Sequence, residues 1–323
     1  MLKELRFVQG AVAKKEFIPA LTHFVIENGE VRGYNGTLAL CSPIPFDIAC
    51  KPKADTLVRA ISNCDDTVTL SMTPAGRLAV RSGSFKAFVD CIEGETPHAT
   101  PDGELVDING AALLEALKAV APFVGDDASR PWSNGVMITR ASAYATNNVC
   151  LVEYWMGVES PFTANIPRIA VKEMLRIDEP PLRAQVTDHS ITFHYEDRRW
   201  IRTQLLPTEW PDLGKVLDKP ANAVAIDQKL FEAVAKVKPF VDKMGRVYFR
   251  EGHISTHEDL SEGASYEVPG LAHDGLYNVE MLALLQNGVT AIDWSLYPRP
   301  CLFFGGRMRG AIIGMHMNKS NAE

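Results

Sequence analysis

Two stretches of the chain, 143-AYATNNVCLVEY-154 and 32-RGYNGTLALCSP-43, each predict a strand, a polar corner and a second strand. They stand about 111 residues apart, and other landmarks recur at about the same step. The first strand of each set carries Val25, Val136 or Val247, and a later hairpin turn carries Gly76, His189 or Arg299. This period exceeds the roughly 20–50 residues of a solenoid unit. It indicates three copies of one domain, each of about 108 residues, across the whole chain.

Bulk composition places the chain among folded globular proteins with room for two or three domains. It has 323 residues, 46% of them apolar, and a net charge of −7. Its acidity argues weakly against a generic nucleic-acid binder, although where the charges lie matters more than their sum. The six cysteines have no Cys-x-x-Cys spacing, which favours buried, reduced thiols and no zinc site. The N-terminus lacks a signal-peptide core and no run approaches ~18 apolar residues, so we expect a cytoplasmic protein without a membrane span.

Within each copy the pattern is β-rich with short helices, an α+β class. A hairpin is expected around Asn28-Gly29, a helix over 53–63 and a second hairpin over 67–82. The same order returns as a helix over 167–177 and a hairpin over 182–196, and again as a helix over 278–287 and a hairpin over 290–304. Further helices, 110–123 and 227–240, precede the second and third sets. In the first copy the corresponding helix is expected between Gly10 and Phe17. Predicted domains are 1–103, 104–219 and 220–323.

The ordered set of these segments resembles the bacterial DNA polymerase III β subunit, the sliding clamp, over essentially the whole chain. The resemblance is clearest in 145-ATNNVCL-151, 166-IPRIAVKEML-175, 204-QLLPTEWPDLGKVL-217 and the ending 312-IIGMHM-317. It implies three clamp domains per chain, with antiparallel sheets outside and paired helices inside. Two chains would form a six-domain ring around duplex DNA. The ring would tether the replicative polymerase as a processivity factor, without catalytic activity or cofactor. The divergence and the length would also suit a phage-encoded member.

The resemblance implies a pocket between the second and third domains for short peptides of the polymerase and the clamp loader. The corner usually reads Thr-Asp-Gly-His-Arg-Leu and the ending Met-Pro-Met-Arg; here they are Thr-Asn-Asn-Val-Cys-Leu and Met-His-Met-Asn, so the basic rim is reduced. The tail beyond Met317 matches nothing in the family. The pocket residues carried over are Thr146, Asn148, Val149, Cys150, Leu151, Pro211, Lys215, Val216, Ile313, Met315 and Met317.

A sliding clamp attracts phosphates without reading bases, so its basic residues are expected on the inner helices. Arg168, Lys172 and Arg176 recur every fourth residue and share one helix face, solvated, while Ile169 and Met174 are expected to turn towards the sheet. The helix 278–287 carries no basic residue. The full set expected to face duplex DNA is Lys14, Lys53, Arg59, Lys118, Arg168, Lys172, Arg176, Lys229 and Lys236.

The ring requires a head-to-tail homodimer, and the joint is expected where residues 104–109 of one chain meet residues 264–269 of the other. Pairing the two edges would also remove exposed strands. The residues predicted at the joint are Val106, Ile108, Ala264, Tyr266 and Val268.

Two other classes of protein remain open. An enzyme could use His189, His194, Asp188 and Glu196, but these flank a hairpin turn and alternate between faces, which favours solvated turn residues. The pair His253 and His257 lies in a strand pattern, where the spacing does not bring both side chains to one metal ion. The other alternative is a duplicated β-rich structural or binding protein that does not encircle DNA, which elution size and polymerase stimulation would distinguish from a clamp.

Overall fold

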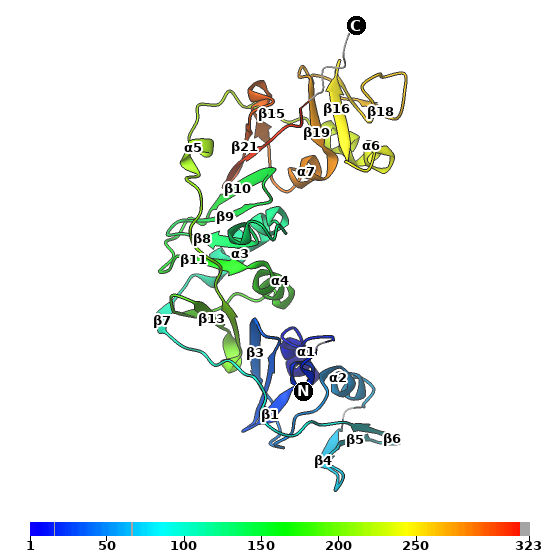
Figure 1. The fold of residues 1–323 in the computed structure, drawn as a ribbon, viewed down its shortest axis with the longest axis vertical. Helices are drawn as coiled ribbons and strands as arrows, with labels where there is room; N and C mark the ends of the chain where they lie inside the picture. The colour runs from blue at the N-terminus through cyan, green and yellow to red at the C-terminus, as the bar shows by residue number, and fades with distance from the viewer. Residues whose placement is uncertain (16, 66, 317–323) are drawn as a thin grey trace. The chain divides into compact units, whose positions relative to one another are not determined.

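A computed structural model describes residues 1–15, 17–65 and 67–316 (Figure 1). The chain is three tandem copies of one α+β domain. In the second and third copies a strand, a helix, four strands, a second helix and three strands follow one another. The first copy has no opening strand among its described residues. The predicted landmarks hold, because Val25, Val136 and Val247 lie in matching strands and Gly76, His189 and Arg299 lie in or beside the matching turns.

The first copy consists of α1 (Leu2–Gln9), η1 (Pro19–Thr22), β1 (Val25–Glu27), β2 (Glu30–Tyr34), β3 (Leu38–Pro43), α2 (Ala54–Ser62), β4 (Thr69–Met72), β5 (Leu78–Ser82) and β6 (Phe85–Val89). The second consists of β7 (Glu104–Asp107), α3 (Gly110–Val120), η2 (Ala121–Phe123), η3 (Pro131–Ser133), β8 (Gly135–Ile138), β9 (Ser142–Thr146), β10 (Cys150–Trp155), β11 (Ala164–Pro167), α4 (Arg168–Ile177), β12 (Arg183–Val186), β13 (Ser190–His194), η4 (Glu196–Arg198) and β14 (Trp200–Gln204). A short helix, α5 (Gly214–Leu217), ends the second copy. The third consists of β15 (Val224–Ala225), α6 (Lys229–Val237), η5 (Lys238–Phe240), β16 (Arg246–Arg250), β17 (His253–Ser255), β18 (Ser265–Glu267), β19 (Gly275–Asn278), α7 (Val279–Leu284), β20 (Ala291–Ile292), η6 (Trp294–Leu296), β21 (Cys301–Gly305) and β22 (Met308–Ile312).

Local sequence explains most of these elements. The turn between β1 and β2 places both Asn28 and Gly29 at positive φ, 52° and 69°, which Asn and Gly tolerate best and which matches the twist of a hairpin. Helix α7 begins at Asn278, whose side chain accepts hydrogen bonds from the N–H groups of Glu280 and Met281. Helix α4 begins at Arg168, one residue after the predicted start, because Pro167 ends β11 and precedes the helix as its N-cap residue.

The expected position of the first helix was wrong. The helix lies at Leu2–Gln9, ahead of the predicted segment between Gly10 and Phe17. Leu5 and Val8 lie three residues apart and are buried together with Phe7, so this stretch has the apolar face that a helix needs. The later stretch contains two lysines and a glutamate and offers no comparable face. Helix α7 and strand β20 are also shorter than predicted.

The chain divides into two compact units, one of Met1–Leu114 with Ser160–Leu206 and one of Glu115–Glu159 with Pro207–Glu323. The boundaries predicted after residues 103 and 219 stay predictions, because these units cut across the copies. Each unit contains strands from two copies that pair in one sheet. A copy is therefore a repeat of sequence and topology, while the packed body is made from parts of neighbouring copies.

In the first unit, one sheet runs β1-β2-β3-β14-β13-β12-β7 and a smaller one runs β4-β5-β6. The antiparallel pair of β3 and β14, with Ala39 opposite Arg202, joins the first copy to the second. Helix α1 packs on β3 and beside α2 (Figure 1). Its Leu5 is fully buried, as are Leu40 of β3 and Leu57 of α2.

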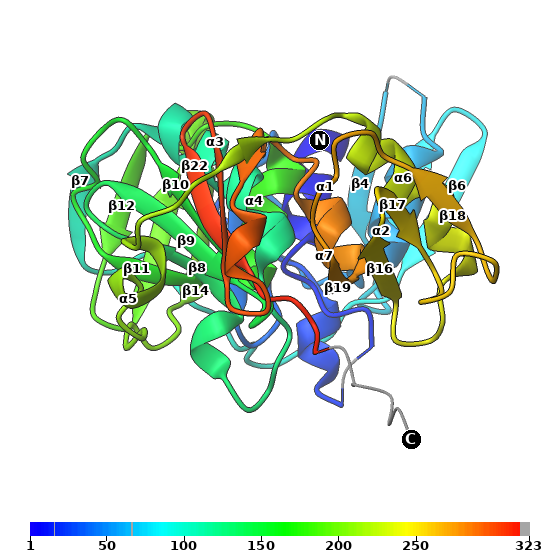
Figure 2. The same cartoon turned by 90° about the horizontal axis from the view of Figure 1, so that it is seen from above.

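In the second unit, strands follow the order β8-β9-β10-β22-β21-β20-β15, and a four-stranded sheet runs β18-β17-β16-β19. Strand β10 pairs antiparallel with β22, so the second copy is joined to the third as the first is to the second. Helix α6 packs on β17 and β18 and beside α7 (Figure 2). The rings of Phe123 and Phe303 stack with centroids 6.3 Å apart in the core.

Candidate partner and nucleic-acid interfaces

The polar corner between β9 and β10 is held by its own side chains. The Asn147 carboxamide oxygen accepts hydrogen bonds from the N–H groups of Val149 (3.1 Å) and Cys150 (2.7 Å). The Thr146 hydroxyl donates to the Cys150 carbonyl (2.8 Å) and accepts from the Asn148 N–H (3.1 Å). Asn148 has a φ of +70°, and its side-chain oxygen accepts a hydrogen bond from Arg130 (2.8 Å). The corner is therefore a fixed surface feature that presents Val149.

Two predicted pocket residues, Leu151 and Val216, lie in one apolar cluster on the sheet that contains β10, β21 and β22. Leu151 alternates with buried Cys150 and Val152, so it faces away from their core. The buried members of the cluster are Leu217, Leu302 and Ala311. The partly buried members are Tyr144, Leu151, Leu213, Val216, Ala221, Leu296 and Phe304.

Ile313, the residue after β22, lies beside the corner. The Ile313 N–H donates to the Val149 carbonyl (2.9 Å), and the Ile313 side chain is 43% exposed. The Met315 N–H donates to the Leu276 carbonyl (2.7 Å), and the Tyr297 hydroxyl donates to the Met315 carbonyl (2.6 Å). The structure thus places Val149 and Ile313 together and Met315 beyond them, half-buried. Met317 lies outside the described residues.

Other predicted pocket residues have more limited roles. Cys150 is buried on the core side, and burial raises the pKa of its thiol to about 12, so its side chain contributes packing. Pro211, before α5, and Lys215, within it, are exposed, and the Lys215 ammonium lies 3.9 Å from the Asp212 carboxylate. Sequence reasoning missed Met281, whose sulfur accepts a hydrogen bond from the Asn147 amide (3.1 Å). It also missed Phe304, although the alternation along 301-CLFFG-305 predicts one side chain on each face of β21 in turn.

A charged network lies next to the apolar cluster and ties β10 to its two neighbours. Glu153 accepts hydrogen bonds from the hydroxyls of Ser142 (2.8 Å) and Tyr144 (2.7 Å) on β9 and from Arg309 (2.6 Å) on β22. Arg309 also donates to Asp218 (3.0 Å). Burial alone would raise the pKa of Glu153, but these hydrogen bonds outweigh it and hold that pKa below its ordinary value. The pKa of Tyr144 is raised to about 12, first because its hydroxyl is buried and second because that hydroxyl is hydrogen-bonded to the Glu153 carboxylate.

The predicted basic face of α4 is present but less solvated than expected. Lys172 is exposed and Arg168 is half-buried. Arg176 donates to the Phe7 carbonyl (2.8 Å) and to Glu173 (2.6 Å), so it ties α4 to α1. Ile169, expected against the sheet, is 40% exposed, because Ala170, Val171 and Met174 form the buried stripe instead.

The remaining predicted DNA-facing residues are exposed within their own units. Lys14, Lys53 and Arg59 belong to the first unit, and Lys118, Lys229 and Lys236 belong to the second. Sequence reasoning missed Lys3 and Arg6 of α1. They line a cavity of about 450 Å³ together with Leu2, Phe7, Arg176, Ile177, Glu179 and Arg199. An acidic chain therefore carries a local basic site beside the α4 face.

Solved structures with the same architecture are known. The chain superposes on a DnaN sliding clamp (DNA polymerase III subunit beta) from Bartonella birtlesii with a TM-score of 0.82, 16% identity, and coverage of 98% of this chain and 97% of that one. Coverage is the same for the DNA polymerase beta subunit of Streptococcus pyogenes (TM-score 0.79, 18% identity) and for the sliding clamp of Bacillus subtilis (TM-score 0.82, 15% identity).

The chain has the sliding-clamp fold. No protein-family model matches it, and no curated protein matches it. The likeness is carried by the complete order of strands and helices, since fewer than one residue in five is identical to these clamps. The resemblance recognised from sequence is confirmed as a likeness of fold.

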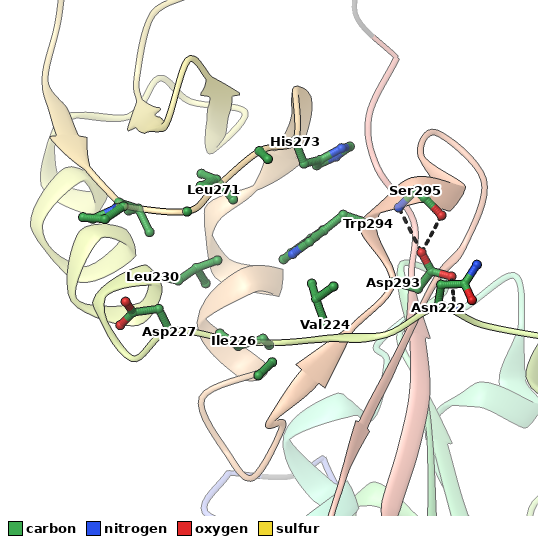
Figure 3. A pocket seen from close by; sticks show the side chains of 15 residues that line it. Asn222, Val224, Ile226, Asp227, Leu230, Leu271, His273, Asp293, Trp294 and Ser295 are labelled. Carbon is green, nitrogen blue, oxygen red and sulfur yellow. Dashed lines mark hydrogen bonds between the residues drawn. The ribbon is translucent and has the colours of Figure 1, made fainter.

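The sliding-clamp fold here also contains a cavity of about 540 Å³ in the second unit, away from the predicted peptide pocket (Figure 3). Trp294 lies across it between Leu230 and Leu271 on one side and Val224 on the other (Figure 3). At one end the Asp293 carboxylate accepts hydrogen bonds from the Asn222 N–H (2.7 Å) and the Ser295 hydroxyl (2.6 Å). Among the predicted site residues, only Val268 lines this cavity.

Two titratable groups of the cavity lining, Asp293 and His273, have shifted pKa values. Burial would raise the pKa of Asp293, but its hydrogen bonds from Ser295 and Asn222 outweigh burial and lower that pKa. Burial lowers the pKa of His273, which stacks on Trp294 with centroids 5.7 Å apart.

Within residues 1–15, 17–65 and 67–316, no group of His, Cys, Asp and Glu could hold a metal ion. The six cysteines are free thiols, four of them buried. No helix in the described part of the chain is long and apolar enough to span a bilayer.

Proposed function

We propose that the protein is a non-catalytic DNA polymerase processivity factor. Two chains would close head to tail into a ring around duplex DNA and tether the replicative polymerase through a peptide pocket between the second and third copies. The proposal rests on the complete clamp fold, which covers 98% of the chain in each clamp compared. It is strengthened by the way in which the copies are joined.

Both joints within the chain use the same two strands of the repeat. Strand β3 of the first copy pairs with β14, the last strand of the second copy. Strand β10, which corresponds to β3, pairs with β22, the last strand of the third copy. The strand of the third copy that corresponds to β3 and β10 is β18, and the strand of the first copy that corresponds to β14 and β22 is β6. Among the described residues, neither is paired with a strand of another copy. Both are end strands of their sheets. A second chain offers the missing partner for each, so a closed dimer repeats the same joint.

The repeated joint favours β6 as the partner of β18, in place of residues 104–109, which the sequence suggested for the joint. Strand β7 corresponds to β15, the opening strand of a copy, and pairs with β12. Its Val106 is half-buried, as is the following Ile108. On β6, by contrast, Phe88 is 44% exposed, with the Lys86 ammonium 4.7 Å from its ring centroid. On β18, Tyr266 is half-buried and Val268 just beyond is buried.

Charge also suits the β6–β18 joint. Strand β6 carries the exposed Lys86, and β18 carries the exposed Glu267, while the Tyr266 hydroxyl donates to Glu232 (2.9 Å). A basic edge facing an acidic one speeds association and disfavours pairing of like edges. Ala264, Tyr266 and Val268 therefore stay in the proposed interface, and Phe88 and Lys86 replace Val106 and Ile108.

Double-stranded DNA is the proposed central ligand, bound without sequence preference. Exposed Lys172, Arg59 and Lys236 on helices α4, α2 and α6 provide long-range attraction to phosphates. Lys3 and Arg6 join them in this proposal because they line a basic cavity with Arg176. The negative charge of the rest of the chain repels DNA from other surfaces.

The polymerase and the clamp loader would insert short peptides at the corner. Leu151 and Val216 supply an apolar floor and Val149 and Ile313 one edge, with Met315 beyond. Methionine suits a surface that accepts several peptides, because its unbranched side chain repacks easily. Replacing Ile313 and Met315 with Ala should weaken a polymerase-derived peptide by about 1–3 kcal/mol in a fluorescence titration. Lys243→Ala, which removes an exposed charge outside the predicted pocket, is the control and should bind the peptide as the parent does. A double variant that binds as tightly as the parent would remove these residues from the site.

Mass and retention on DNA test the function as a whole. Light scattering at micromolar concentration should give about twice 35.6 kDa. A ring loaded on a nicked circle should remain there and should slide off once the circle is cut. A duplicated β-rich protein that does not encircle DNA would show no difference between circular and linear DNA, and that result would sink the proposal.

A further inference from the structure

The cavity of about 540 Å³ in the second unit has no part in the function proposed above. Protein interiors are packed closely enough to leave few voids larger than one water molecule. This cavity instead has the size of a ligand site, which is about 300–1,000 Å³. Four segments of the third copy converge on it, namely residues 222–227, the start of α6, residues 268–273 and residues 293–295. All four lie in one compact unit, so the cavity belongs to a single packed body.

One polar group in the cavity wall is without a partner. Trp294 is only 8% exposed, and its indole nitrogen is directed towards Leu230 (Figure 3). In the described part of the chain, no group accepts a hydrogen bond from this N–H. Tryptophan N–H groups usually find an acceptor when they are buried, and leaving such a donor unpaired costs free energy. The cavity therefore presents a donor that an acceptor on a ligand would satisfy.

The wall around this N–H is mainly apolar. Leu230 and Leu271 lie on one side of Trp294, and Val224 of β15 lies on the other (Figure 3). The Val224 side chain is 58% exposed although it lines the cavity. An apolar ligand would remove this side chain from water, which favours binding in proportion to the area covered.

The charges in the cavity wall disfavour an anionic ligand. The Asp293 carboxylate is buried, and Asp227 is exposed where α6 begins, its carboxylate accepting a hydrogen bond from the Lys229 N–H (2.9 Å). Among the described residues that line the cavity there is no lysine or arginine. Burial lowers the pKa of His273, so this side chain is uncharged at pH 7. A negative charge on a ligand would be repelled by both carboxylates and would find no cation beside it.

We propose that this cavity binds a small apolar molecule that carries a hydrogen-bond acceptor and no negative charge. The acceptor receives the Trp294 N–H, and the apolar body of the molecule covers Val224 and Leu230. A peptide strand suits the cavity less well, because β15 offers an edge of two residues and Pro269 beyond β18 has no N–H to donate. The proposal does not rest on the function proposed above.

Benzamide is the probe, because it combines a flat apolar ring with a carbonyl acceptor and has no charge. In a ligand-observed NMR titration of the full-length protein, its dissociation constant should be about 1–10 mM, the range expected for a molecule of so few atoms. Benzoate has nearly the same shape but a negative charge, and it should bind at least about fivefold more weakly. Toluene has the ring without the acceptor and isolates the contribution of the indole N–H.

Two pairs of protein variants locate the site. Val224→Trp fills the cavity and should abolish benzamide binding, whereas Val158→Trp, at another exposed valine of the second unit, should bind as the parent does. Trp294→Phe removes the N–H and keeps an aromatic ring, so it should weaken benzamide about 2–10-fold and change toluene by less than about twofold. Trp155→Phe, at an exposed tryptophan of the same unit, is the matched control and should change neither. Urea unfolding checks that each variant is folded.

Four results would overturn the proposal. The first is no binding of benzamide to the parent protein at about 20 mM. The second is benzamide binding that Val224→Trp leaves unchanged, which would place the probe elsewhere on the protein. The third is equal weakening of benzamide and toluene by Trp294→Phe, which would give the indole N–H no part in binding. The fourth is a lower mass of Val224→Trp than of the parent in light scattering, which would make a second copy of this chain the occupant.

Discussion

At the scale of single residues, the corner between β9 and β10 shows how a diverged sequence keeps a geometry. The resemblance leads one to expect Asp-Gly where this chain has Asn147 and Asn148. Asn147 still accepts two backbone hydrogen bonds, as an aspartate at this position would. Asn148 takes a φ of +70°, a region that glycine and, after it, asparagine tolerate best. Asn in place of Asp therefore removes a charge from the corner, while both asparagines suit the conformation that the corner has here.

We expect Asn147→Ala to lower the free energy of unfolding by about 1–3 kcal/mol, because the N–H groups of Val149 and Cys150 lose their acceptor. Asn148→Gly relieves the strain of the positive φ and should change the free energy of unfolding by less than about 1 kcal/mol. Urea unfolding of both variants measures the difference. Equal losses in the two variants would mean that the turn is held by something other than the Asn147 side chain.

At the scale of elements, β10 and β22 are joined by the Glu153–Arg309 pair as well as by their backbone ladder. The pKa of Glu153 is lower in the folded protein than its ordinary value of 4.5. The stabilisation is therefore present above that ordinary value and is lost as the pH falls through the folded pKa. Unfolding midpoints in urea from about pH 6 to about pH 3 should fall, and less steeply in Glu153→Gln. Glu159→Gln, an exposed partner of Arg140, should follow the parent curve.

Helix α4 supplies another test, because Arg176 binds the Phe7 carbonyl while Lys172 is free to face solvent. Lys172→Ala should weaken DNA retention and reduce its salt dependence without changing the unfolding midpoint. Arg176→Ala should also lower the free energy of unfolding, by about 1–3 kcal/mol, because the Phe7 carbonyl between α1 and α4 loses its charged donor. Thermal and urea unfolding alongside a salt series of DNA retention separate the two effects. A Lys172→Ala protein that unfolds earlier than the parent would show that this side chain is structural.

Elements with a local signal were predictable, and those that depend on distant partners were not. The Asn28-Gly29 hairpin and the α4 stripe follow from turn chemistry and helical spacing. The first helix was misplaced although Leu5 and Val8 have helical spacing, because its eight residues make only about two turns and so short a pattern is a weak signal. Leu151, Val216 and Ile313 came from the resemblance; the structure places Leu151 and Val216 in one apolar cluster and Ile313 beside Val149, and their role in a peptide pocket stays a prediction. Arg176 at Phe7, Phe304 in the cluster and the identity of the free edge strands depend on pairings between residues far apart in sequence.

At the scale of the whole molecule, the proposed dimer depends on which free strand of the first copy meets β18. Phe88→Asp should yield a protein of 35.6 kDa in light scattering at micromolar concentration, because it buries a carboxylate in the β6–β18 joint. Leu105→Asp changes a comparably exposed apolar residue on β7 and should leave the dimer intact. The opposite pattern would restore residues 104–109 to the interface.

Sheets shared between successive copies have a consequence for how the protein is made. Strand β3 ends at residue 43 and its neighbour β14 ends at residue 204, so the ladder between them closes only after both have left the ribosome. At about 5–20 residues per second, roughly 8–30 seconds of synthesis separate them. During that time the nascent first copy exposes the inner edge of its own sheet. Chaperones should therefore bind the nascent chain mainly within its first 200 residues. A chain truncated after residue 103 should aggregate.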